Sequence, residues 1–334
     1  VEEKATGEIM AGAGFGTGGS SITAGVKENN YLGKGIALNT NLTITDDTIR
    51  GMFSLTNPNY KNTDKSVYTS IESSEIDKLS DFGYKTSKTG ASFGTKFELY
   101  DNFDLGLGMN SFYERIDTHS SASALQKKQK GNYFDNFLNL ELDYDKRDQK
   151  FQTSEGFRSF YGTNIPLISD SNTFTNLFTF TRYNKFLDKN VFKSSFYFKS
   201  SNSITGENIK LSERITIPSK RLRGFEYGKV GPKDGNDYIG GNFVSAANFS
   251  SSLPQIFENS QTTDFSLFLD IANIWGVDYD STIDSKSQDV RSSIGINLDW
   301  FSAVGPLSFS LSQPITKSST DKTQSFRFNL GTTF

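Results

Sequence analysis

Hydrophobic and polar residues alternate with a period of two along much of this chain. In residues 323–334 the even positions are mostly hydrophobic and the odd positions are mostly polar. The same division recurs at 290–300, 264–272 and 138–145. Because successive side chains of a β-strand point to opposite faces, this pattern predicts strands with one apolar and one polar face.

About sixteen such strands can be placed along the sequence, and most have a length that can cross a bilayer at a tilt. They lie near 7–13, 20–28, 34–45, 48–57, 64–75, 86–99, 104–115, 132–145, 156–166, 173–186, 190–202, 240–251, 262–274, 289–301, 305–314 and 323–333. A soluble β-sandwich also alternates, but it usually contains only seven to nine strands. An even, larger number favours an all-β fold, a 16-stranded antiparallel transmembrane β-barrel, in which closure pairs every strand edge.

The connections between the predicted strands differ in length. Short turns are expected at Asp46-Asp47, at 187–190 and at 303–306, whereas 117–131 and 203–239 are long and polar. Short turns at one end and long loops at the other are typical of outer-membrane barrels. We therefore expect residues 1–334 to form a single barrel domain in the outer membrane of a Gram-negative bacterium.

Composition agrees with such a barrel and excludes other classes. The chain has 30 Phe and 14 Tyr but only 35% hydrophobic residues, and it contains no run of about 18 apolar residues that a membrane helix needs. A net charge of −3 argues against nucleic acid as a partner. The absence of cysteine excludes disulfides and thiol-based metal sites.

Several motifs resemble functional sites but have simpler explanations. Residues 14–19 match the dinucleotide-binding spacing GxGxxG, yet an alternating segment follows instead of a helix. His119 stands alone in a polar loop, and the spacing of Asp278, Asp280 and Asp284 fits no calcium loop. No nucleophile and base are paired. We expect neither an enzyme nor a metal or cofactor site.

The most informative segment lies in the longest loop, at 217–239. The candidate lid-loop motif comprises Arg221, Leu222, Arg223, Gly224 and Phe225, and Tyr227 follows it. The two arginines, the glycine and the two aromatic residues are costly to expose together. Asp270 lies on the polar face of a later strand, where an arginine could bind it with two hydrogen bonds. Either this loop folds inward as a lid and Arg223 meets Asp270, or it is an ordinary extracellular loop.

These residues resemble the BamA-type outer-membrane assembly superfamily. Arg223-Gly224-Phe225 is similar to the family's RGF lid-loop motif. Further similar segments follow in the family's order at 29–35, 144–148, 153–156, 231–232, 240–242, 268–275, 291–296, 305–314 and 326–334. Ser250 departs from the pattern, because some members place a second carboxylate there. The family's periplasmic POTRA repeats are missing, so we expect a barrel separated from them.

The resemblance implies a function, namely folding and inserting client outer-membrane proteins through a lateral gate between the first and last strands, without nucleotide. Implied partners are the client proteins, accessory lipoproteins, periplasmic chaperones, and outer-membrane lipid and lipopolysaccharide. Glycine weakens strand pairing. We therefore expect the gate at Gly7, Ile9, Gly12, Gly14, Phe326, Phe328, Leu330 and Phe334.

Two other functions fit parts of the pattern. A TamA-like or two-partner-secretion translocator would share the barrel and the lid motif. A passive porin would share the barrel alone and would conduct ions steadily.

Overall fold

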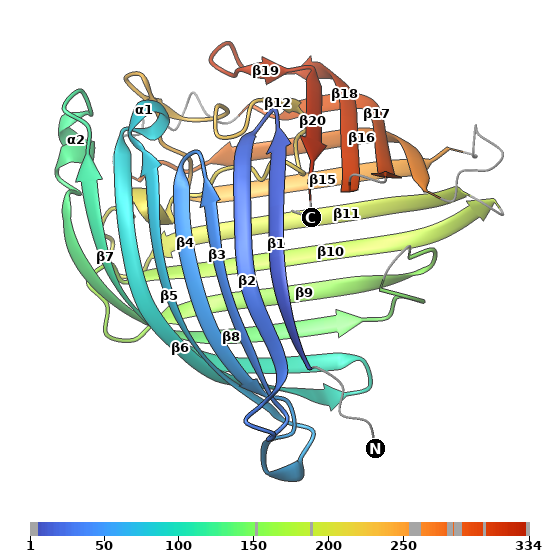
Figure 1. Cartoon of the computed structure of the whole chain (residues 1–334). Coiled ribbons are helices and arrows are strands. Elements are labelled where there is room, and N and C mark those ends of the chain that lie inside the picture. Colours follow the sequence, from blue (N-terminus) through green and yellow to red (C-terminus); the bar gives the residue numbers. More distant parts are fainter. Residues whose placement is uncertain are drawn as a thin grey trace. The chain divides into compact units, whose positions relative to one another are not determined.

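A computed structural model of the chain describes residues 6–150, 153–187, 190–253, 262–278, 283, 289–302 and 305–331. Sixteen strands form one closed antiparallel barrel in the order β1–β11, β15–β18 and β20, which confirms the predicted fold class (Figure 1). The barrel strands are β1 Gly7–Gly16, β2 Gly19–Tyr31, β3 Ile36–Thr45, β4 Thr48–Asn57, β5 Ser66–Lys78, β6 Tyr84–Tyr100, β7 Phe103–Thr118, β8 Gly131–Asp145, β9 Gly156–Pro166, β10 Thr173–Leu187, β11 Asn190–Ser203, β15 Phe243–Ser252, β16 Thr263–Trp275, β17 Arg291–Ser302, β18 Gly305–Thr316 and β20 Phe326–Leu330.

Short elements lie in the connections. The helical turns are η1 Tyr60–Asn62, α1 Leu79–Phe82, α2 Ala124–Lys127 and η2 Leu211–Glu213, and the short strands are β12 Gly224–Phe225, β13 Lys233–Asp234, β14 Asp237–Tyr238 and β19 Thr323–Gln324. Among the residues that the structure describes, no helix is long and apolar enough to cross a membrane.

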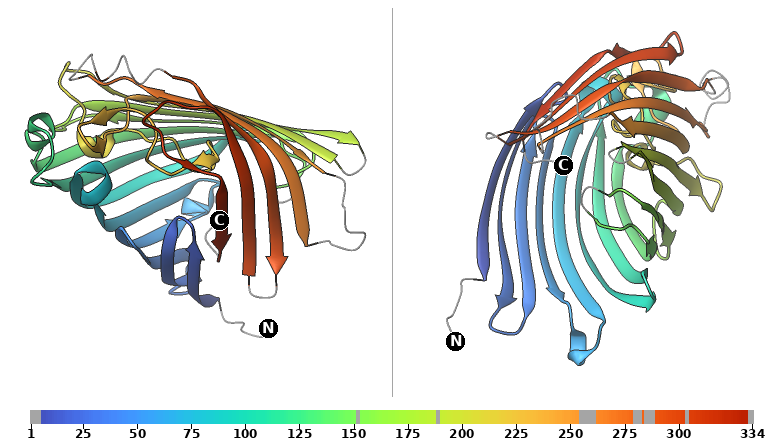
Figure 2. Two further views of the ribbon diagram at one scale, coloured as in Figure 1. Left: turned by 90° about the horizontal axis from the view of Figure 1, so that it is seen from above. Right: turned by 90° about the vertical axis from the view of Figure 1, so that its right-hand side faces the viewer.

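By its internal contacts the chain divides into two compact units. Unit 1 comprises residues 1–14, 19–142 and 163–172, and unit 2 comprises 15–18, 143–162 and 173–334. Figure 2 shows the long neighbouring strands β15–β18 of unit 2. The lid loop and every residue predicted to contact it belong to unit 2.

Two predicted strands were wrong in their extent. The GxGxxG segment is the end of β1 and its hairpin to β2, so the first strand runs to Gly16 and not to residue 13. The last predicted strand, 323–333, is divided: β20 pairs with β18, whereas β19 pairs with β12 in the long loop. β19 thus pairs with the long loop and not with a barrel strand. Alternation along the sequence cannot reveal which partner a strand takes.

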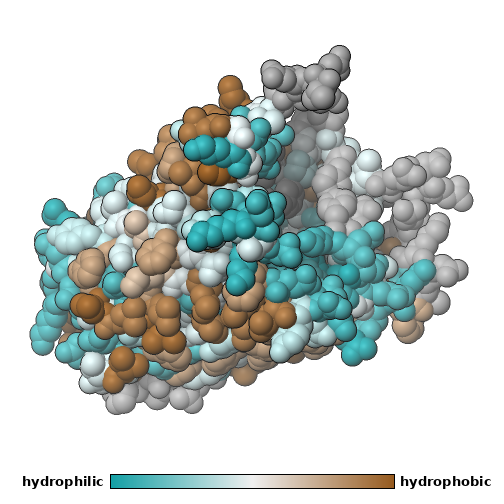
Figure 3. All heavy atoms as spheres, turned by 90° about the horizontal axis from the view of Figure 1, so that it is seen from below, coloured by the Kyte–Doolittle hydropathy of each residue, from teal (hydrophilic) through white to brown (hydrophobic). Residues whose placement is uncertain are grey.

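Each unit has one face of exposed apolar side chains. In unit 1 they include Ile22, Ile71 and Phe93, and in unit 2 Leu267 and Ile294. Figure 3 shows hydrophobic side chains gathered on the face that it displays, with hydrophilic ones on either side. Apolar residues at every second strand position on an exposed surface are typical of a lipid-facing sheet. We call the opposite face of β11, β15–β18 and β20 the inner face.

This assignment of faces can be tested within one strand. Ile71→Lys places a charge on the exposed apolar face of β5, and we expect it to reduce the free energy of unfolding in lipid vesicles by about 2–4 kcal/mol, the cost of a lysine near the bilayer midplane. Ser70→Lys, one residue away on the other face, is the matched control and should change stability by less than about 1 kcal/mol. Equal losses in urea titrations would contradict the assignment.

Candidate functional site

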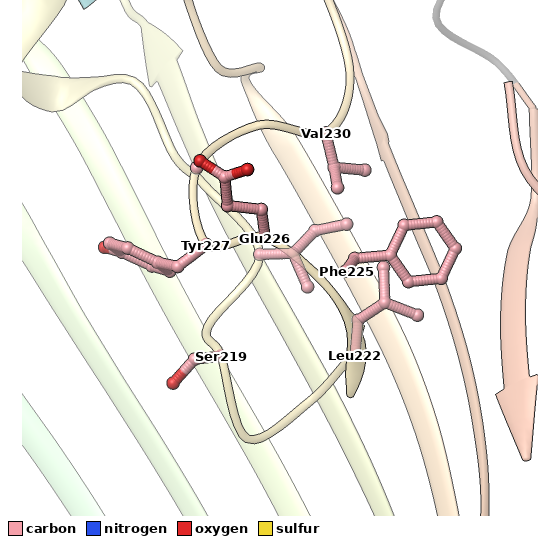
Figure 4. Close-up of a pocket in the computed structure, with 8 residues that line it drawn as sticks. Ser219, Leu222, Phe225, Glu226, Tyr227 and Val230 are labelled. Atoms are coloured by element: carbon pink, nitrogen blue, oxygen red, sulfur yellow. The ribbon is translucent and has the colours of Figure 1, made fainter. Parts of the chain in front are cut away.

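The connection between β11 and β15 packs back onto the inner face of unit 2. Within it, residues 217–239 form the lid loop. Leu222, Phe225 and Val230 are buried and join one apolar cluster with residues of the barrel strands, among them Val244 and Ile274. Figure 4 shows these three side chains on one side of the loop, with Ser219 and Tyr227 pointing the other way. The loop is therefore held as an ordered part of the interior and not as a solvated surface loop.

Arg223 binds Asp270 of β16 with both ends of its guanidinium group. Its Nε lies 2.8 Å from Asp270 Oδ2, and its Nη2 lies 2.8 Å from Asp270 Oδ1. The backbone N–H of Arg223 also donates to Oδ2 at 3.0 Å. The side chain of Asp270 is completely buried, so its charge depends on these donors. The arrangement has the fork geometry that makes an arginine–carboxylate pair strong and directional.

The inner face gives Arg223 two further contacts. Its guanidinium carbon lies 3.5 Å from the ring centroid of Phe268, which fits a cation–π contact. The Ser293 hydroxyl of β17 donates a hydrogen bond to the carbonyl oxygen of Arg223. The residue is thus held at its side chain, its N–H and its C=O.

Arg221 is held by neighbouring strands. Its Nη1 donates to Ser195 Oγ of β11 at 2.6 Å and to Asn248 Oδ1 of β15 at 3.2 Å. Asn248 Nδ2 in turn donates to the Arg221 carbonyl at 2.8 Å and to Asp270 Oδ1 at 2.9 Å. Asn248, and not Ser250, occupies the position opposite Asp270 on the neighbouring strand. Asn248 carried no signal in the sequence, because its importance comes from strand register.

Gly224 lets the loop approach the sheet closely. Its φ is +88°, a conformation that residues with a side chain rarely adopt, and a Cβ there would lie 3.1 Å from Ser312 Cβ and 3.3 Å from Ser293 Cβ. Small residues on β17 and β18 thus provide the space into which the lid motif fits.

The lid loop also binds the segment that precedes β20. Gly224 and Phe225 pair with Gln324 and Thr323, and the N–H of Glu226 donates to Lys322 O at 3.0 Å.

The β13–β14 hairpin of the loop reaches the same segment. The Tyr238 hydroxyl donates to Thr320 O at 2.7 Å. Burial raises the pKa of the Tyr238 phenol.

A second buried ion pair was not predicted. Arg291 Nε of β17 lies 2.9 Å from Asp321 Oδ2, and both side chains are fully buried. Asp321 Oδ1 also accepts the N–H of Gly231 at 3.2 Å, so this pair fixes the far end of the lid loop. The sequence offered no signal for it, because 30 residues separate the partners and the pairing depends on where the β18–β19 connection folds.

The other residues considered in the sequence have local roles. Asp278 forms an ion pair with Arg214, whose side chain is almost completely buried. Asp280 and Asp284 lie outside the described residues. His119 Nδ1 lies 2.6 Å from the Ser121 hydroxyl in the loop after β7.

The first and last barrel strands meet in a short seam. In the described part of the chain, Phe15 pairs with Leu330 and Gly16 with Asn329, and the N–H of Thr17 donates to Phe328 O at 2.9 Å. Five residue pairs, by comparison, join β18 to β20.

Some of the residues that were predicted to form the gate lie in or beside this seam. Phe328 and Leu330 lie in it, and Phe326 is in the same strand, β20. Gly7, Ile9, Gly12 and Gly14 belong to unit 1, and Phe334 lies outside the described residues. The opposite side of the seam consists of Phe15 and Gly16 of β1 and of Thr17 in the following turn, none of which was predicted from the sequence.

Comparison with known proteins identifies the family. Residues 30–334 match the Omp85 superfamily domain. The chain belongs to the Omp85 superfamily. Its structure superposes on that of BamA from Haemophilus ducreyi lacking POTRA domains 1–3 with a TM-score of 0.91 and 24% identity, covering 100% of this chain and 71% of that one. This Omp85 barrel therefore has the fold of the BamA barrel and is an integral protein of the bacterial outer membrane.

Two curated relatives of this Omp85 barrel are outer membrane protein assembly factors BamA. The protein of Neisseria meningitidis serogroup B is 32% identical over 143 residues, which cover 34% of this chain and 17% of the relative. The protein of Nitratidesulfovibrio vulgaris is 22% identical over 346 residues, which cover 100% of this chain and 42% of the relative. The chain spans less than half the length of these relatives.

A double-mutant cycle tests the ion pair at the centre of the lid in this Omp85 barrel. Arg223→Ala and Asp270→Ala should each reduce the free energy of unfolding by about 3–5 kcal/mol, because each leaves an uncompensated buried charge. The double variant should lose little more than either single one, as measured by denaturant unfolding. Fully additive losses would contradict direct pairing.

The control for this cycle is Arg50→Ala with Glu72→Ala. These partners also form an ion pair, but they are more exposed. Their losses should stay near 0–1 kcal/mol, roughly the range for exposed pairs.

Proposed function

We propose that this barrel folds and inserts client outer-membrane proteins, and that a lateral gate between β1 and β20 opens to receive them without nucleotide. The observation that carries the proposal is the short seam. In the described part of the chain it contains two residue pairs, the flanking hydrogen bonds between Thr17 and Phe328, and an edge contact between the Phe15 and Phe328 rings. A backbone hydrogen bond contributes only about 0.5–1.5 kcal/mol to stability. Opening this seam therefore costs far less than opening a fully paired strand interface.

An open seam would present unpaired backbone groups on the edges of β1 and β20. Such edges bind further strands by β-augmentation, because each free N–H and C=O seeks a partner. A client chain that is rich in alternating strands can supply those partners in succession. Strand addition requires no bond cleavage, which agrees with a mechanism that uses no nucleotide.

The lid loop would preserve the rest of the barrel while the gate opens. Arg223 and Arg221 bind side chains on β11, β15 and β16, and Ser293 of β17 binds the Arg223 carbonyl. These contacts connect four adjacent strands from the inside. We propose that Arg223 and Asp270 keep these strands in register during each opening.

The names of the curated relatives, outer membrane protein assembly factors, support this function. The partners proposed with it are client outer-membrane proteins, accessory lipoproteins of an assembly complex, periplasmic chaperones, and outer-membrane lipid and lipopolysaccharide. The same relatives favour assembly over the translocator and porin alternatives.

A disulfide across the seam tests the gate. The chain contains no cysteine, so Phe15→Cys with Leu330→Cys introduces one defined cross-link between paired residues. We expect the oxidised protein to lose at least about tenfold in the rate of client insertion into vesicles, because the edges cannot separate, and reduction should restore the rate.

The matched control joins two strands that the proposal keeps together. Leu298→Cys with Phe309→Cys links a paired position of β17 and β18 and should leave the rate within about twofold. Unimpaired insertion by the oxidised seam variant would overturn the gate.

A further inference from the structure

We propose that Arg327 is a positioning residue that couples the lid loop to the closing strand, so that opening of the seam and release of the lid are linked. This inference rests on the proposed gate and adds a mechanism for its control. The sequence does not mark Arg327 as a functional residue, because it is one of several polar residues at alternating positions of the last strand.

The geometry places Arg327 between the two parts. It belongs to β20, where it pairs with Ser310 of β18. Its Nη1 donates to the Ser219 carbonyl at 2.9 Å and its Nη2 to the Phe225 carbonyl at 2.8 Å. These two carbonyls stand on either side of Arg223 along the loop. The planar guanidinium thus closes the loop around Arg223 and attaches it to β20.

Because Arg327 is charged, its guanidinium needs hydrogen-bond acceptors where it is removed from water. Among the described residues, no carboxylate forms an ion pair with its guanidinium, so the lid carbonyls are the acceptors that compensate its removal from water. Arg327 is partly buried, and hydrogen bonds to charged groups are stronger than neutral ones. Movement of β20 or of the lid alone therefore breaks both of these hydrogen bonds.

The next residue in the chain holds the seam. The carbonyl of Phe328 accepts the N–H of Thr17 at 2.9 Å, beside the pairs that join β1 and β20. Adjacent residues of β20 therefore contact two different parts: Arg327 binds the lid, and Phe328 binds Thr17 directly after β1 and contacts the ring of Phe15 in β1. A displacement of β20 that breaks the seam also pulls the Arg327 guanidinium from the lid carbonyls.

Coupling of this kind is reciprocal, because each event changes the free energy of the other by the same amount. Closing the seam should keep the lid docked, and loss of Arg327 should make the lid independent of the seam. Trypsin can report lid release, because the docked loop holds Arg221 and Arg223 in contacts with the sheet. Cleavage then follows the population of the released state.

The experiment measures tryptic cleavage of the lid in the full chain in lipid nanodiscs, with and without the oxidised Phe15→Cys and Leu330→Cys pair. With Arg327 present, locking the seam should slow lid cleavage about 5- to 150-fold, the usual range for coupled sites. In Arg327→Met the same lock should change cleavage less than about twofold. Arg327→Lys, which keeps the charge but cannot span both carbonyls, should give an intermediate effect.

Arg158→Met is the matched control. Arg158 also lies in unit 2 and binds Asp143 with two hydrogen bonds, but it is not bonded to the lid loop. This variant should keep the full effect of the lock. If Arg327→Met does not fold, as judged by heat-modified gel migration, Arg327→Gln and Arg327→Lys provide the same comparison.

Two outcomes would overturn the coupling. One is that the oxidised disulfide slows lid cleavage equally with and without Arg327. The other is that the disulfide does not change the cleavage rate when Arg327 is present. The experiment contains no client protein, so either outcome leaves the gate to be decided by the insertion assay. Conversely, if the insertion assay contradicts the gate, the cleavage measurement still shows whether the lid and the seam are coupled in the barrel.

Discussion

The ion pair of Arg223 and Asp270 is the interaction on which the interior of unit 2 depends. Asp270 is fully buried and accepts three hydrogen bonds from Arg223 and one from Asn248. A buried carboxylate without such donors would be strongly unfavourable, so the lid loop and the sheet stabilise each other. The close approach of Gly224 to β17 and β18 and the hydrogen bond from Ser293 accompany this pair on the same inner face.

The distribution of strong and weak contacts determines which part of the molecule can move. The lid is fixed by the Arg223 pair, by the buried pair of Arg291 and Asp321, and by an apolar cluster that includes Leu222 and Phe225. In the described part of the chain, the seam between β1 and β20 is held by two residue pairs and by the contacts of Phe15 and Thr17 with Phe328. Stabilising contacts are thus denser in the lid than in the seam, which agrees with the gate proposed there.

The sequence was sufficient for the fold and for part of the site. Alternation predicts the strands because lipid on one face and a polar interior on the other place opposite demands on successive residues. The pairing of Arg223 with Asp270 could be proposed because both are charged and lie in segments that resemble a known family. Asn248, Asp321 and Arg327 could not be found this way, because their partners are fixed by register and by the folding of loops.

The division of the last strand shows why local pattern fails at this site. Thr323 and Gln324 alternate as well as the residues of β20 do, yet they pair with the lid loop. Their partner is a loop about a hundred residues earlier in the chain. This loop is held on the inner face by the ion pair of Arg223 with Asp270. The last segment of the chain is consequently shared between the lid and the barrel wall: Thr323 and Gln324 pair with the lid loop, whereas Asn329 and Leu330 pair with β1.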